Sequence, residues 1–118
     1  MGIKDCYENI GADYESVLTR FGSDKLVYSF LKRYFEKNEY ETLAHAVDEE
    51  NWKDAFMYAH NMKGFGLNLS LTELSEASSV LCEALRSGEP KGDVGEMLSN
   101  VRNAYVRAEK AVRALDGE

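Results

Sequence analysis

Only one proline interrupts this chain, and apolar residues recur at three- and four-residue spacing along most of its length. Both features favour helices, because proline breaks a helix interior and this spacing gathers apolar side chains on one helical face. The pattern is longest from Val94 to Leu115, where it continues for more than three heptads. The sequence therefore predicts an all-α fold.

Candidate capping residues divide the chain into helical segments. We expect helices at residues 14–21, 24–37, 39–48, 52 to about 67, 72–86 and about 93–115, with a turn at 68–71. The expected N-caps are Asp13, Ser23, Asn38, Asn51 and Thr72. Residues 1–12 carry few apolar anchors and form either a short helix or a loose N-terminal arm. Because the connections are short, we predict a single domain over residues 1–118, an up-down four-helix bundle with an additional short N-terminal helix.

The charge and the cysteines restrict the class of protein. A net charge of −7 disfavours nucleic-acid binding, because an acidic surface repels phosphates. No apolar run reaches the roughly 18 residues that span a bilayer, and the N-terminus lacks a signal-peptide pattern. We therefore expect a cytoplasmic protein that binds no membrane. Cys6 and Cys82 show no CxxC spacing, so we expect free thiols, with Cys82 half-buried.

One histidine of the chain has neighbours that suit phosphate chemistry. His60 lies roughly 100–120° from the centre of the apolar stripe of its predicted helix, at the edge of solvent. Lys63 and Gly64 follow at positions i+3 and i+4, so the three residues share one patch. An imidazole nitrogen can accept a phosphoryl group, the ammonium offsets its charge, and the missing side chain admits a partner. Glycine inside a helix costs about 0.5–1 kcal/mol relative to alanine. Close helix contact can explain Gly66, which lies on the packing side, but it cannot explain Gly64.

Further residues of the same region are candidates for docking a partner. Met57, Leu67 and Phe56 would form an apolar rim around His60, and Lys53 and Arg86 would extend the positive charge. His45 lies on the polar side of its helix with no motif around it, and we interpret it as incidental. Two histidines fifteen residues apart, without HExxH or ExxH, make a metal site improbable. No glycine loop for phosphates and no GxSxG motif is present, so we expect neither metal nor cofactor.

The motif resembles a known family. Its parts are Ala-His-x-x-Lys-Gly at residues 59–64, Asn-Leu at residues 68–69, and Leu74. This order is similar to the signature of histidine-containing phosphotransfer domains, four-helix relay modules of two-component signalling. Such domains take a phosphoryl group from one receiver-domain aspartate and pass it to another, without hydrolysing ATP.

The resemblance implies a role for each residue of the patch. His60 matches the phosphoacceptor, Lys63 the cation beside the phosphoryl group, and Gly64 the small position that admits the receiver. The implied partners are response-regulator receiver domains and a hybrid histidine kinase. We therefore expect a monomeric phosphocarrier that is not an enzyme.

Two departures from the family pattern affect the site, and two alternatives stay open. Ser70 stands where many members have glycine, and we expect serine to cost little there. Cys82 stands where many have Glu or Gln, and a thiol is a weak hydrogen-bond partner for an imidazole. The first alternative is a helical adaptor that docks receiver-like partners but never carries phosphate. The second is a metal-dependent helical-bundle enzyme, which the missing ligands disfavour.

Overall fold

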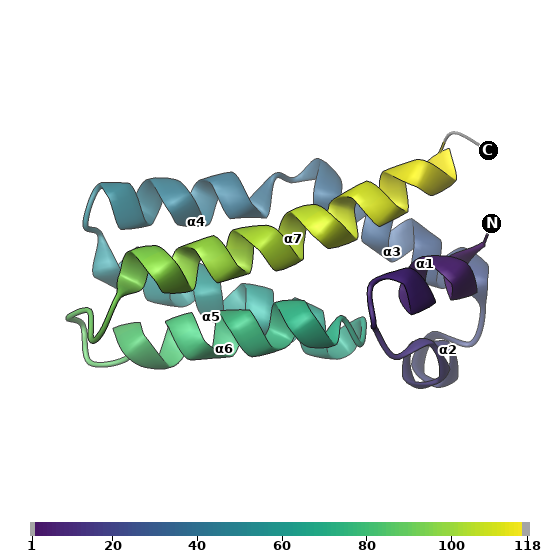
Figure 1. Ribbon diagram of the computed structural model, residues 1–118, viewed down its shortest axis with the longest axis horizontal. Helices are drawn as coiled ribbons and strands as arrows, with labels where there is room; N and C mark the ends of the chain where they lie inside the picture. The colour runs from purple at the N-terminus through teal and green to yellow at the C-terminus, as the bar shows by residue number, and fades with distance from the viewer. Residues whose placement is uncertain (1, 117–118) are drawn as a thin grey trace.

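The computed structural model describes residues 2–116, and every regular element in this range is a helix (Figure 1). In chain order the helices are α1 (Ile3–Asn9), α2 (Tyr14–Phe21), α3 (Asp24–Glu36), α4 (Glu39–Asp48), α5 (Trp52–Asn68), α6 (Thr72–Leu85) and α7 (Val94–Asp116). The all-α prediction is confirmed, and the chain forms a helical bundle. None of these helices is long and apolar enough to cross a membrane.

Helices α4 to α7 lie side by side along the long dimension of the molecule (Figure 1). Short turns join α4 to α5 and α5 to α6, so these three helices alternate in direction. A longer connection brings α7 back alongside α6 and α4. Helix α5 packs mainly against α4 and α6, which leaves one of its faces for solvent.

The helix ends agree with most of the expected caps. The side chains of Asp13, Ser23 and Asn51 each accept a hydrogen bond from a backbone N–H of the helix that follows. Asn38 precedes α4 but its side chain forms no cap hydrogen bond, because its backbone is left-handed with φ of 56°. The prediction for Thr72 is wrong, since Leu71 occupies the N-cap position of α6 and Thr72 is the first helical residue.

The N-terminal segment is anchored by three buried side chains. Ile3, Cys6 and Tyr7, on α1, are at most 5% exposed. Of the two alternatives for residues 1–12, the loose arm is therefore wrong for residues 2–12, and Met1 lies outside the described residues. Three- and four-residue spacing of Ile3, Cys6 and Tyr7 supplies an apolar face within only two helical turns.

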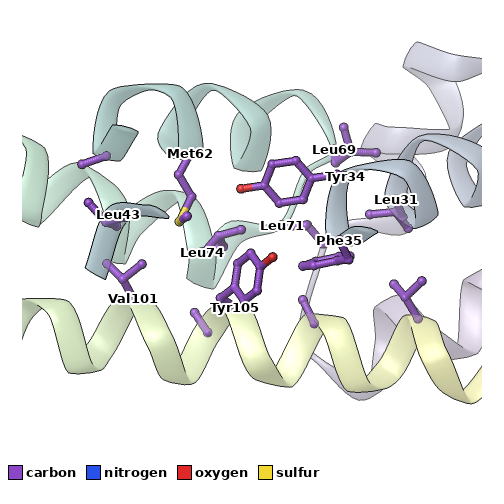
Figure 2. Close-up of a cluster of buried hydrophobic side chains, with 14 of the residues drawn as sticks. Leu31, Tyr34, Phe35, Leu43, Met62, Leu69, Leu71, Leu74, Val101 and Tyr105 are labelled. Atoms are coloured by element: carbon purple, nitrogen blue, oxygen red, sulfur yellow. The ribbon is translucent and has the colours of Figure 1, made fainter. Parts of the chain in front are cut away.

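Aromatic residues form the centre of the core (Figure 2). Tyr34 of α3 stacks on Phe65 of α5, with ring centroids 3.4 Å apart and planes 10° apart. Phe35 of α3 meets Tyr105 of α7 edge to face, with centroids 5.0 Å apart. The core therefore joins α3 to both α5 and α7, and it holds the inner face of α5 in a fixed position.

A Schellman motif ends α5 and turns the chain into α6. The Leu71 N–H donates to the Gly66 carbonyl at 2.8 Å, and the Ser70 N–H donates to the Leu67 carbonyl at 3.2 Å. Ser70 is left-handed, with φ of 57°, at the position where this motif usually has glycine. That backbone costs a non-glycine residue about 1 kcal/mol, which corrects the expectation that serine costs little here.

The N-terminal helices bind this turn through its carbonyl groups. The Tyr7 hydroxyl donates to the Leu69 carbonyl at 2.7 Å, and the Asp13 N–H donates to the Ser70 carbonyl at 3.1 Å. The guanidinium of Arg20 donates to the carbonyls of Leu67 and Asn68 and, at 3.2 Å, to the Ser70 hydroxyl. These contacts satisfy carbonyls that the end of a helix leaves unpaired, and they fix the C-terminal end of α5.

Candidate functional site

Helix α5 carries all but one of the predicted site residues along a single outer stripe. Asn51 caps the start of the helix, and its side chain accepts a hydrogen bond from the Asp54 N–H at 3.2 Å. Its inner face is marked by the buried residues Ala55, Ala59, Met62 and Gly66. The outer stripe, which we call the His60 face, consists of Lys53, Phe56, Met57, His60, Lys63, Gly64 and Leu67. Their spacing of three and four residues places them on one side of a helix.

The imidazole of His60 is exposed and accessible. It stacks on the ring of Phe56, with centroids 6.1 Å apart and planes 18° apart. Neither ring nitrogen forms a hydrogen bond with any residue in the range 2–116. The packing of Phe56 therefore restricts the tilt of the imidazole while both nitrogens stay open to a reaction partner.

Arg86, near the end of α6, also reaches the His60 face. Its guanidinium carbon lies 5.5 Å from the centroid of the Phe56 ring. Cation–π contacts of this length are attractive. Phe56 thus contacts both the imidazole and the guanidinium, so the structure brings His60, Phe56 and Arg86 near one another.

Sequence reasoning missed Glu83, which holds Arg86 in this place. The guanidinium donates to the Glu83 carboxylate from Nη2 at 2.7 Å and from Nε at 3.1 and 3.2 Å. These hydrogen bonds hold the pKa of Glu83 below its usual range, and Lys63 contributes in the same direction. The i, i+3 spacing of Glu83 and Arg86 on a predicted helix was the available signal.

Lys63 is half-buried beside His60 and forms no ion pair within residues 2–116. Its charge acts on Cys82 as well as on Glu83. Cys82 is only 1% exposed, so the prediction of a half-buried thiol is wrong. Burial raises the pKa of the Cys82 thiol, although Arg86 and Lys63 offset part of this effect.

Two glycines of α5 differ in what surrounds them. A Cβ added to Gly64 would meet no heavy atom within 4 Å outside its own helix backbone, so packing does not require glycine there. A Cβ added to Gly66 would lie 2.9 Å from the backbone nitrogen of Ser75. The expectation that Gly66 allows close helix contact is confirmed, and Gly64 leaves an open space one turn from His60.

The remaining predicted docking residues extend the His60 face in both directions. Met57 is 47% and Leu67 55% exposed, and Lys53 is exposed near the start of α5. His45 lies elsewhere, on α4, beside a shallow depression lined by Glu41, Glu49 and Asp54. Within residues 2–116, no group of three or more His, Cys, Asp or Glu side chains is arranged to hold a metal ion.

Comparison of the chain with family models, with curated proteins and with solved structures finds no match. The case for a function therefore depends on the chemistry of the His60 face and on the resemblance of its motif.

Proposed function

We propose that this protein is a phosphocarrier of a two-component phosphorelay, with His60 as the phosphoacceptor. One observation carries the proposal: an exposed imidazole with unblocked nitrogens lies beside a cation and a glycine that packing does not explain. A core histidine would be buried, and a structural glycine would touch a neighbouring helix, as Gly66 does.

The transfer step is a displacement at phosphorus. A neutral nitrogen of His60 attacks the aspartyl phosphate of a receiver domain, an N–P bond forms, and the P–O bond to the aspartate carboxylate breaks. Onward transfer reverses these bonds with a second receiver. Lys63 offsets the charge of the phosphoryl group, which is near −2. The Mg²⁺ and the acidic pocket that promote the reaction belong to the receiver, so the carrier itself is not an enzyme.

The His60 face suits such a partner. Lys53, Lys63 and Arg86 supply positive charge on a protein whose net charge is −7, and a receiver presents an acidic pocket. Met57 and Leu67 supply exposed apolar area around the reacting group. The proposed partners are receiver domains and a hybrid histidine kinase, which places the reaction in the cytoplasm.

The proposal includes the finer architecture. We classify α4 to α7 as an up-down four-helix bundle, with α1, α2 and α3 added at its N-terminal side. This arrangement would display the middle of α5 on the outside of the bundle, where a receiver can reach it.

The alternative function is an adaptor that docks receiver-like partners without carrying phosphate. The exposed side chains of Met57 and Leu67 favour docking in either case. The two functions differ only in whether His60 becomes phosphorylated.

Mass spectrometry after mixing with receiver domains that acetyl phosphate has phosphorylated, in the presence of Mg²⁺, separates the two. We expect acid-labile, base-stable label on His60. A control incubation with ATP and Mg²⁺ alone should leave the protein unlabelled. If no receiver labels the protein but receivers bind it, the adaptor function replaces the proposed one.

A further inference from the structure

The carboxylate of Glu83 is paired with Arg86, the cation that reaches the His60 face from the end of α6. Three hydrogen bonds of 2.7 to 3.2 Å join it to Arg86, and both side chains are 56% exposed. The charge of Lys63 acts on it as well. Glu83 therefore interacts with two positive charges that a phosphoryl group on His60 would also attract.

The register of α5 and α6 places Glu83 close to His60. Gly66 packs against Ser75 toward one end of this antiparallel pair, and Phe56 lies under Arg86 toward the other. Glu83 precedes Arg86 by almost one turn, so it lies at the level of residues 58–59. Its carboxylate is held against Arg86, whose guanidinium contacts the same Phe56 ring that stacks on the imidazole.

We propose that Glu83 competes with the phosphoryl group for Arg86 and thereby keeps phosphorylated His60 ready to transfer. This inference rests on the proposed function and adds a residue that sets the balance of the relay. When His60 is phosphorylated, two negative groups share Arg86, and the phosphoryl group also lies near the charge of Glu83. Both effects raise the free energy of the phosphorylated form relative to a site without Glu83.

A residue that limits the stabilisation of phosphohistidine helps a carrier to release its phosphoryl group. A carrier that bound its phosphoryl group too tightly would accept it from one receiver and not release it to the next. Binding energy that stabilises the bound state alone raises the barrier to the following step. Glu83 limits that stabilisation while Lys63 and Arg86 still neutralise part of the charge.

The test uses phosphoramidate as the phosphoryl donor, so that it needs no particular receiver. In this reaction the N–P bond of phosphoramidate breaks, a bond from phosphorus to a His60 nitrogen forms, and ammonia leaves. At fixed concentrations of phosphoramidate and ammonium, the ratio of labelled to unlabelled protein reports the free energy of phosphohistidine. The ratio is measured for the wild type and for Glu83→Gln, Arg86→Gln and the double variant.

We expect Glu83→Gln to raise the ratio about two- to fivefold, in the range of interactions between exposed charges. The increase should shrink at 1 M salt, where charges are screened beyond about 3 Å. It should also fall by more than half in the Arg86→Gln background. The matched control is Glu76→Gln, because Glu76 is exposed on the same side of α6, two turns away, and forms no ion pair with any described residue.

Three results would overturn the inference while leaving the proposed function intact. They are a labelled wild type with an unchanged or lower ratio in Glu83→Gln, an equal increase in Glu76→Gln, and a full increase without Arg86. An unlabelled wild type would instead count against the phosphocarrier function itself. Melting curves of each variant show whether a change in the ratio follows from unfolding.

Discussion

Gly64 and Gly66 lie on the same helix with one residue between them, and their surroundings differ. Gly66 faces α6, where an added Cβ would come within 2.9 Å of the Ser75 backbone. Gly64 faces outward, where an added Cβ would meet no atom within 4 Å. The first glycine is explained by packing, whereas the second lowers helix propensity without any compensation in the fold.

The difference extends along both faces of α5. On the inner face Ala55, Ala59 and Met62 are buried, and the two alanines are small, as a close helix contact requires. On the outer face Met57 and Leu67 are exposed although they are large and apolar. Folding accounts for the inner face, whereas it leaves the composition of the outer face unexplained. The predictions that follow test this division.

The largest effect is expected at the centre of the outer face. His60→Gln removes the nitrogen that would accept the phosphoryl group, so labelling by phosphorylated receivers or phosphoramidate should be lost entirely. His45→Gln is the matched control, because His45 is also an exposed helical histidine. Mass spectrometry of both variants decides the assignment, and label that persists in His60→Gln would refute it.

Gly64→Gln should separate function from stability. The Gln side chain would stand in the space through which the receiver's aspartyl phosphate approaches, and a displacement of about 1 Å between reacting atoms can cost about 100-fold in rate. The free energy of unfolding should hold or rise by up to about 1 kcal/mol, because the site is helical and open. Phosphotransfer assays quenched at successive times measure the rate, and urea unfolding measures the free energy of unfolding.

Gly64→Ala serves as the intermediate case, with a smaller loss of rate. If Gly64→Gln transfers at the wild-type rate, the outer glycine has no role in access. If it loses transfer only because it unfolds, the division between the two faces fails at this position.

Gly66→Ala should give the opposite result. The added methyl group would force α5 and α6 apart or distort the Ser75 backbone, and overpacking of this kind costs typically about 1–3 kcal/mol. The rate of transfer per folded molecule should stay close to that of the wild type. Urea unfolding followed by circular dichroism tests the first expectation, and an unchanged midpoint would show that the helix contact is more adaptable than its geometry indicates.

The sequence predicted the faces of α5 well, because they depend on helical periodicity, which is local. It did not predict the burial of Cys82, which depends on how closely α6 approaches α5. Nor did it predict the anchoring of residues 2–12, because two turns of helix contain too few positions for a clear apolar period. The energetic cost of the left-handed backbone at Ser70 was also not predicted, because the position of the left-handed residue in a Schellman motif depends on where α5 ends.

The site was predictable to a similar extent. The motif singled out His60, Lys63 and Gly64, and helical periodicity alone places the three on one side of α5. Glu83 was overlooked because carboxylates at i, i+3 from arginine are common on exposed helices and rarely matter. Its place beside the His60 face follows from the register of α5 and α6, which only tertiary packing fixes.

The smallest predicted effect tests whether the N-terminal helices help to fix the end of α5. Arg20 reaches from α2 to the carbonyls of Leu67 and Asn68, and a cation at the C-terminus of a helix also interacts favourably with the helix dipole. Arg20→Gln should lower the free energy of unfolding by about 0.5–1.5 kcal/mol, the usual net contribution of such a hydrogen bond.

Arg33→Gln is the control for this last change, because Arg33 is exposed on α3 and contacts no charged partner among residues 2–116. It should alter the free energy of unfolding by less than about 0.5 kcal/mol. Hydrogen exchange gives the finer readout, since loss of the Arg20 contacts should increase exchange at the amides of Ser70 and Leu71, whose hydrogen bonds close the turn. Equal exchange in both variants would mean that Tyr7 and Asp13 hold the turn without Arg20, so that the Arg20 contacts do not fix the end of α5.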